Sequence, residues 1–377
     1  MALPLRTRNE RLSPTGSQTV ARLDPIGDPA TYNVATFSAT SGDDSIMTVC
    51  RATRVEAAAR LHLGFLDPDA SRGRRFGSIG LAIDGFSTVV QVAPDHGLSV
   101  TGSGAARART YVDRLVAHYN LPLAFKVSIE RAIPAHAGLG SGTQLALALG
   151  TAILAAHGRQ ASAREVAAVL DRGKRSGIGL GLFERGGLIV DGGHGPATAM
   201  PPVIAQLPVP LSWRAVLVLD RSDEGLNGRA ESAAFAALPR MSTAAAAGLC
   251  HVTLMALLPA IVESDFAAFS HAIAEVQAVI GDHFARVQAG RFTSASVRSA
   301  IAHATANCGL VGVGQSSWGP TAFVWVESAA HAQALVEQLR AVYGHLPQLE
   351  FVICGARNHG ASLSHDEQAT PRRAIRA

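Results

Sequence analysis

Residues 133–149 read IPAHAGLGSGTQLALAL, a strand end followed by a glycine-rich turn and the first turns of an apolar helix. Gly138, Gly140 and Gly142 carry no side chain, so the backbone can approach a ligand closely there. The first N–H groups of a helix have no partner inside the helix, and the helix dipole places positive charge at the same end. The stretch therefore predicts a site for an anion, most directly phosphate. An ordinary strand-turn-helix junction is the alternative.

Composition limits the class of protein. The chain has 377 residues, of which 48% are hydrophobic and 16% charged, so a sizeable core is expected and the length favours two domains. The net charge is only +4 and aromatic residues make up 5%, so no basic face for nucleic acid is predicted. The four cysteines are far apart and form no CxxC pair, which favours reduced thiols and a cytoplasmic location.

Two windows of the sequence are apolar enough to be compared with membrane spans. Residues 132–158 and 241–262 contain no Asp, Glu, Lys or Arg, but a glycine loop interrupts the first and the second contains His and Pro. We predict buried helices of a soluble protein, not membrane spans.

Residues 1–46 show little periodicity, which predicts a disordered extension or a start codon placed too early, and residues 365–377 are expected to be a loose tail.

The order of the predicted elements indicates an α+β fold with domains at residues 47–207 and 208–364. In the first domain, strand patterns surround the glycine loop and its helix, and residues 105–119 and 161–172 have helical patterns. The second of these ranges begins with Ser162-x-x-Glu165, which resembles a capping box. The second domain contains two strand-helix units and a final strand, which indicates a ferredoxin-like sandwich. Its predicted helices cover residues 230–238, 243–264, 266–288, 296–307 and 330–343.

The glycine loop has neither the spacing of a P-loop nor that of a dinucleotide-binding turn. Pro134 and GLGSG instead resemble the P-x-x-x-G-L-G-S-S-A loop of the GHMP kinase superfamily. The resemblance spans residues 48–361 and implies a GHMP-kinase-like fold, with a ribosomal protein S5 domain 2-like N-terminal domain and a ferredoxin-like C-terminal domain.

One departure from the kinases bears on activity. Several of these kinases contain S-G-I-D, whose aspartate acts on the acceptor hydroxyl, whereas residues 176–179 read SGIG. Glycine cannot accept a proton, so the phosphate loop is kept while the base of the kinase reaction is missing. The loop departs as well, with Gly142, Thr143 and Gln144 in place of Ser-Ala-Ala.

Five motifs in a fixed order support a closer resemblance. They are ARLHLGFLD (59–67), GRRFGSIG (73–80), GLGSGTQ (138–144), RSGIG with FERGGLIVDGG (175–193) and GQSSWGPT (314–321). Together they resemble the β-ribofuranosylaminobenzene 5'-phosphate synthases, a non-kinase family of the GHMP superfamily. The resemblance implies a pentosyltransferase that joins phosphoribosyl diphosphate to 4-aminobenzoate or 4-hydroxybenzoate, with Mg2+, releasing carbon dioxide and diphosphate in tetrahydromethanopterin biosynthesis. It also implies a homodimer.

The reaction suggests roles for the residues of these motifs. The guanidinium group of Arg matches phosphate oxygens, and His can move a proton near neutral pH. Arg60, His62 and His136 are the candidate catalytic residues, although a structural role is the alternative for each histidine. The candidate phosphate-binding residues are Gly138, Gly140, Ser141, Gly142, Thr143, Gln144, Arg74 and Arg75. For the two arginines of GRRFGSIG, a solvated loop is the alternative.

The remaining candidates concern the metal and the aromatic acid. Asp67 and Asp191 are candidate Mg2+ ligands, because this ion is often held by one or two carboxylates plus phosphate oxygens; a turn is the alternative role for Asp191. An aromatic acid needs a flat apolar wall with polar ends. The predicted pocket residues are Gln315, Ser316, Ser317 and Trp318, with core packing as the alternative for Trp318. An ATP-dependent small-molecule kinase, with Asp171 or Asp191 as its base, and a non-catalytic phosphate-ligand sensor are the competing functions.

Overall fold

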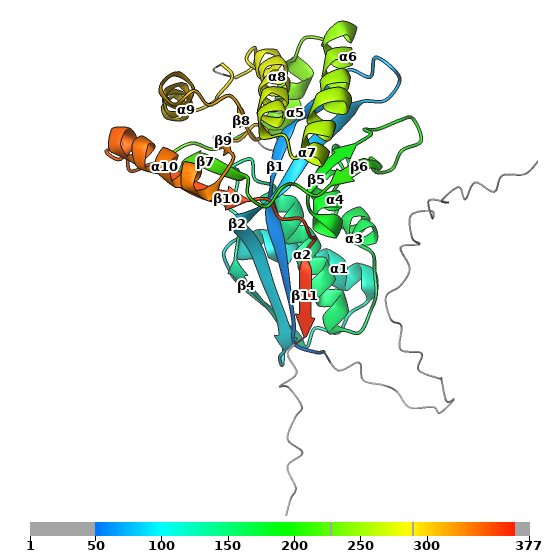
Figure 1. Cartoon of the computed structure of the whole chain (residues 1–377). Helices are drawn as coiled ribbons and strands as arrows, with labels where there is room; N and C mark the ends of the chain where they lie inside the picture. The colour runs from blue at the N-terminus through cyan, green and yellow to red at the C-terminus, as the bar shows by residue number, and fades with distance from the viewer. Residues whose placement is uncertain (1–49, 227, 289, 366–377) are drawn as a thin grey trace, which may run out of the picture. The chain divides into compact units, whose positions relative to one another are not determined.

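The computed structural model describes residues 50–226, 228–288 and 290–365, which belong to one compact unit. The predicted N-terminal extension (1–46) and residues 366–377 of the predicted tail lie outside the described residues. Two β-sheets, each with helices against it, make up this unit (Figure 1).

The first sheet is organised around a long antiparallel pair, β1 (Thr53–Asp67) and β2 (Phe76–Pro94). The second half of β2 pairs with β4 (Phe125–Arg131), and its first half pairs with β5 (Leu188–Asp191). The remaining strands lie outside these: β3 (Ser99–Gly102) beside β4, β6 (Val203–Leu207) beside β5, and β11 (Ser362–His365) beside β1. The last residue of β11 therefore belongs to the stretch predicted as tail.

The described residues of the first half of the chain form four helices: α1 (Ala105–Tyr119), α2 (Ser141–Ala156), α3 (Ala163–Val169) and α4 (Ile178–Arg185). The bounds of α1 match the predicted range, and α3 begins at the predicted capping box, in which Ser162 and Glu165 exchange hydrogen bonds. Sequence reasoning missed α4, because its glycines, which lower helix propensity, suggest a loop. Most residues of α2 are buried, which fits its uninterrupted apolar sequence.

The second sheet has the order β10-β7-β9-β8 and is antiparallel throughout. Its strands are β7 (Arg214–Asp220), β8 (Val313–Gln315), β9 (Ala322–Val326) and β10 (Leu349–Gly355). The helices of this half are α5 (Gly228–Ala237), α6 (Thr243–Val252), α7 (Leu258–Glu263), α8 (Phe266–Phe284), α9 (Ala295–Cys308) and α10 (Ala329–Tyr343), with a π-helical turn at Thr253–Leu257 between α6 and α7. The strand order is that of a ferredoxin-like sandwich, as predicted.

Alternating residues of β7 connect two hydrophobic cores. Val216 and Val218 pack with residues of α9 and α10, whereas Ala215 and Leu217 face a core that also contains Leu61 of β1. In Figure 1, α6 and α8 accordingly lie over one end of the β1 and β2 pair. The two halves of the chain thus share apolar residues, which brings the motif at 314–321 next to β1.

The helix from Thr243 to Glu263 is, among the described residues, long and apolar enough to span a membrane by length and composition. One of its faces packs against α8 and β1, but Leu254, Met255 and Val262 are between 63% and 69% exposed. The prediction of a buried helix in this window therefore holds for one face only.

Candidate functional site

The glycine loop between β4 and α2 is held by its carbonyl groups. The Gly138 oxygen accepts hydrogen bonds from Arg60 Nη1 (2.5 Å) and Ser316 Oγ (2.7 Å), and the Leu139 oxygen accepts one from the Arg60 N–H (3.0 Å). Gly140 precedes α2 in a left-handed conformation, φ 83°, and offers no side chain to cap the helix. The N–H groups of the first turn of α2 are consequently left for a ligand.

A cavity of about 350 Å³ lies against this loop and adjoins a larger one of about 860 Å³. The first is lined by Arg60, His136, Trp318 and five predicted phosphate-binding residues: Gly138, Gly140, Ser141, Gly142 and Thr143. Ser317 lines both cavities. The sixth predicted residue of the loop, Gln144, is buried elsewhere, with its Nε2 donating to the Gly179 oxygen (2.9 Å).

Three arginines that sequence reasoning did not assign also line these cavities. Arg107 comes from α1 and Arg172 from the segment before α4, and both line the cavity at the glycine loop. Arg175 lines the larger cavity and forms an ion pair with Glu231 of α5, 2.5 Å apart. The position of Arg175 in the RSGIG motif is the one sequence feature that could have identified it as a site residue, whereas no motif contains Arg107. The cavities are therefore rich in cations that suit an anionic ligand.

Arg74 and Arg75 lie outside the lining of both cavities. Arg74 donates from Nε and Nη2 to the carbonyl oxygens of Gly192 (2.6 Å) and Gly193 (2.7 Å). Arg75 donates to the Pro68 oxygen (2.8 Å), and its guanidinium group lies 4.8 Å from the centre of the Phe76 ring. The structure thus places both predicted phosphate ligands where they stabilise neighbouring loops.

The two candidate metal ligands are occupied by hydrogen-bond donors. Asp67 accepts from the N–H groups of Asp69 (3.1 Å) and Ser71 (2.7 Å) and from the Ser71 hydroxyl (2.6 Å). The described part of the chain contains no group of three His, Cys, Asp or Glu residues arranged to hold a metal. Asp67 in this arrangement does not fit a resident Mg2+ ion.

Asp191 is fully buried and accepts from the N–H groups of Gly177 and Gly193 (both 2.9 Å) and from Ser176 Oγ (3.2 Å). Burial raises the pKa of this carboxyl group, while the hydrogen bonds act in the opposite direction. Asp191 therefore joins the start of α4 to the GG turn, which is the turn role considered for it, and it does not fit a metal ligand either.

The predicted pocket motif links the second half of the chain to β1. Ser316 is fully buried; its Oγ accepts from the His62 N–H (3.0 Å), while the Ser317 N–H donates to the His62 oxygen (3.2 Å). Gln315 supports this turn, because its Nε2 donates to the Ser317 oxygen (3.1 Å) and its N–H donates to Gln277 of α8 (2.9 Å). The motif is therefore fixed to β1 and α8.

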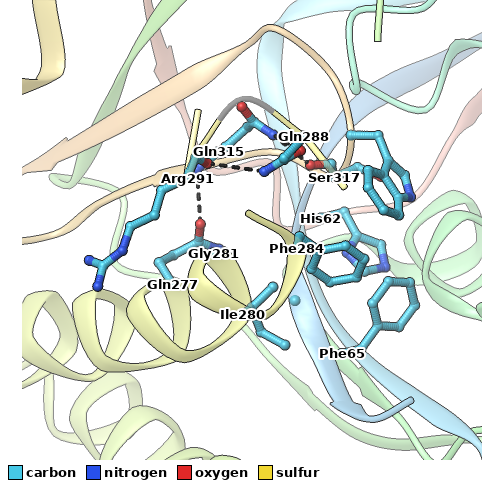
Figure 2. Close-up of a pocket in the computed structure, with 12 residues that line it drawn as sticks. His62, Phe65, Gln277, Ile280, Gly281, Phe284, Gln288, Arg291, Gln315 and Ser317 are labelled. Atoms are coloured by element: carbon cyan, nitrogen blue, oxygen red, sulfur yellow. Dashed lines mark hydrogen bonds between the residues drawn. The ribbon is translucent and has the colours of Figure 1, made fainter. Parts of the chain in front are cut away.

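Trp318 belongs to an aromatic cluster beside the glycine loop. It is 3% exposed, and its ring meets the rings of Phe284 (4.4 Å between centroids) and Phe235 (5.1 Å) edge to face. It also lines a cavity of about 30 Å³ with His62, Phe65, Gln315 and Ser317 (Figure 2). This volume is far too small for a benzoate.

His62 and Arg60 lie at the junction of these cavities. Burial, followed by the charges of Arg60 and Arg175, lowers the pKa of His62 to about 3, so the ring is neutral at physiological pH. Its Nε2 atom has no hydrogen-bond partner within the described residues. Burial also lowers the pKa of Arg60 to about 10, which leaves it charged. His136 is half-buried at the loop, where its carbonyl oxygen accepts from the Gly225 N–H (2.9 Å).

Comparison with known proteins identifies the family. Residues 104–182 match the GHMP kinases N terminal domain, and residues 257–345 match the GHMP kinases C terminal family. A beta-ribofuranosylphenol 5'-phosphate synthase from Methanothermobacter thermautotrophicus is 30% identical over 332 residues, which cover 82% of this chain and 98% of that protein. The chain belongs to this synthase family. A synthase of the same name from Archaeoglobus fulgidus is 29% identical, covering 82% of this chain and 99% of the other.

Solved structures confirm the predicted fold class. Homoserine kinase from Cytophaga hutchinsonii superposes with a TM-score of 0.57 at 16% identity, covering 86% of this chain and all of that chain. Mevalonate diphosphate decarboxylase from Staphylococcus aureus superposes with a TM-score of 0.58 at 16% identity, covering 83% of this chain and 98% of that chain. At such identities the likeness concerns the fold alone.

Thr143 and Gly179, at which this chain differs from the kinase motifs, lie next to each other in the structure. A Cβ atom at Gly179, where the kinases carry aspartate, would lie 2.9 Å from Cγ2 of Thr143. Thr143 stands where the kinase loop has alanine, so its methyl group fills space that a side chain at 179 would need. The chain thus lacks the aspartate of the S-G-I-D motif and has little room for a side chain at position 179. Asp171, considered above as an alternative base, lines the larger cavity.

Gly138→Ala tests the close approach of the loop to the 316–319 turn. A Cβ there would lie 2.2 Å from the Ser316 carbonyl oxygen, at a φ of 76°. We expect the free energy of unfolding in urea to fall by about 2–4 kcal/mol. The control is Gly158→Ala, which has a φ of 65° but nothing within 4 Å, and should lose only about 1 kcal/mol. Equal losses would contradict the proposed contact.

The lowered pKa of His62 predicts a loss of stability in acid. In the unfolded chain, His62 becomes protonated below its ordinary pKa of 6.5. In the folded protein, His62 stays neutral until the pH falls to about 3. The contribution of His62 to the unfolding free energy is therefore fully present above pH 6.5 and decreases as the pH falls towards 3. Between pH 7 and 5, the unfolding free energy of His62→Gln should fall less than that of the unsubstituted protein. Replacing the exposed His118 with Asn should leave the slope unchanged; an unchanged slope in His62→Gln would contradict the prediction.

Proposed function

We propose that this chain condenses phosphoribosyl diphosphate with a para-substituted benzoate to give an aryl C-riboside 5'-phosphate (a β-ribofuranosylbenzene), carbon dioxide and diphosphate. One observation carries the proposal: Ser317 and Trp318 join a cation-rich cavity at the glycine loop to an aromatic cluster. The two substrates need these two environments side by side. The relatives are named for a ribofuranosylphenol, which favours 4-hydroxybenzoate as the acceptor, with 4-aminobenzoate as the alternative.

The anionic substrate suits the loop and its arginines. Phosphoribosyl diphosphate carries three phosphoryl groups, for which the start of α2 and the guanidinium groups of Arg60, Arg107 and Arg172 offer donors and positive charge. Neutralising the diphosphate favours its departure from the sugar, so these residues would act by positioning and charge stabilisation.

The bond changes need no covalent intermediate with the protein. The bond from sugar C1 to the diphosphate oxygen breaks, and its electron pair leaves with diphosphate. The ring carbon that bears the carboxylate forms the new bond to C1, assisted by electrons from the para substituent. The bond to the carboxyl carbon then breaks, carbon dioxide leaves, and the electron pair restores the aromatic ring. Neutral His62, next to Arg60, suits hydrogen bonding at this junction better than acid catalysis.

Further parts of the proposal concern the setting of the reaction. We expect Mg2+ to be bound by the diphosphate oxygens of the substrate, because Asp67 and Asp191 are engaged in turns. We also expect a cytoplasmic homodimer in tetrahydromethanopterin biosynthesis, with no nucleic-acid or membrane partner.

The direct test follows the carboxyl carbon. Purified protein is incubated with phosphoribosyl diphosphate, Mg2+ and carboxyl-labelled 4-hydroxybenzoate or 4-aminobenzoate, and released label is counted. Release that depends on phosphoribosyl diphosphate supports the synthase. ATP consumption without label release would indicate a kinase, and tight binding without any turnover would indicate a sensor; either result contradicts the proposal.

Gly179→Asp tests whether the missing base alone separates this chain from the kinases. We expect no ATP turnover above background, because the acceptor geometry is also missing and Thr143 obstructs the new side chain. The double variant Thr143→Ala with Gly179→Asp should recover stability lost by the single variant, as measured by thermal unfolding. Efficient ATP turnover by either variant would contradict this account.

A further inference from the structure

Helix α5 presents a carboxylate and a phenyl ring to the same guanidinium group. Glu231 and Phe235 are four residues apart and so lie on one face of the helix. Arg175 Nη1 lies 2.5 Å from the Glu231 carboxylate, and its guanidinium carbon lies 4.6 Å from the centre of the Phe235 ring. Arg175 therefore contacts an aromatic ring and a carboxylate together, the two chemical groups of a benzoate.

The ring of Phe235 also occupies the centre of the aromatic cluster. Its centroid lies 5.6 Å from that of Phe65, 5.8 Å from those of Phe76 and Phe284, and 5.1 Å from that of Trp318, each time close to edge-to-face. Three of these partners line the small cavity of Figure 2, where His62, Phe65 and Phe284 face the same space. A ring from α5 thus fills the aromatic surface next to the anion site.

The contacts of α5 suit an element that can be displaced. The helix contains no buried residue, and Arg175 and Glu231 remain 34% and 27% exposed in their side chains. Exposed ion pairs are weak, and segments with little buried apolar area open most readily. A small anionic ligand with an aromatic ring could therefore compete with these two side chains.

We propose that Glu231 and Phe235 occupy the benzoate subsite when no ligand is bound, and that Arg175 is the residue that selects the carboxylate of the incoming aromatic acid. The inference rests on the proposed function and identifies where the acid would bind. Displacement of Phe235 would free the space that its ring fills beside Phe65, Phe284 and Trp318, three of the residues that line the 30 Å³ cavity.

The exchange at Arg175 sets the order of binding and release. The acid exchanges with Glu231 at Arg175, and its ring exchanges with Phe235. Once carbon dioxide has left, the product has no carboxylate to hold Arg175, so Glu231 can pair with it again. Return of α5 would then favour product release over rebinding.

The test measures binding directly, by titration calorimetry of the full chain with 4-hydroxybenzoate and with its uncharged analogue 4-hydroxybenzamide. Removing a competing group raises the binding-competent fraction, so Glu231→Gln and Phe235→Ala should each lower the Kd for the benzoate about three-fold or more. Arg175→Gln should raise it about ten-fold or more and abolish the preference for benzoate over benzamide. The matched control is Glu224→Gln, an exposed carboxylate outside both cavities, which should leave the Kd unchanged.

Four results would overturn the inference. A higher Kd for the benzoate in Phe235→Ala would show that the Phe235 ring lines the pocket in the bound state as well. A preference for benzoate that persists in Arg175→Gln would remove Arg175 as the selecting residue. Equal binding by every variant would defeat this inference alone, whereas no benzoate binding by any form, with phosphoribosyl diphosphate still bound, would defeat the proposed function as well.

Discussion

The hydroxyl group of Ser316 joins the parts of the molecule on which the site depends. It donates to the Gly138 oxygen of the glycine loop and accepts from the His62 N–H of β1, so segments 178 and 254 residues away meet at one buried atom. Hydrogen bonds in a fully buried position gain strength, and loss of one partner leaves the others unsatisfied. The position of the loop is therefore set by the second half of the chain as much as by its own glycines.

Around this junction the site divides into a cationic, anion-binding side and an aromatic side. Arginines from β1, α1 and the segment before α4 gather at the loop, whereas rings from β1, α8 and the 314–321 motif gather behind it. Ser317 belongs to both sides, which suits a reaction between a sugar diphosphate and an aromatic acid. Beside the loop, the Thr143 methyl group fills the space that a side chain at position 179 would need.

The candidate residues illustrate why motifs alone identify a site incompletely. Arg74, Arg75, Asp67 and Asp191 belong to the family motifs and have the chemistry expected of ligands, yet their hydrogen bonds are satisfied within loops. Arg107 and Arg172 have no motif around them and reach the cavity because their elements pack beside the loop. Residue type predicts what a side chain can bind, but the supply of nearby carbonyl and N–H groups decides what it does bind.

The sequence by itself determined the elements whose causes are local. Periodicity predicted α1, the capping box predicted the start of α3, and the glycines predicted the turn before α2, because helix, cap and turn preferences depend on residues a few positions apart. Only the tertiary structure decided that Glu231 and Phe235 meet Arg175, that Ser316 closes the loop, and that Gln144 turns away from the cavity. Those contacts depend on how sheets and helices pack across hundreds of residues, and no local pattern records that packing.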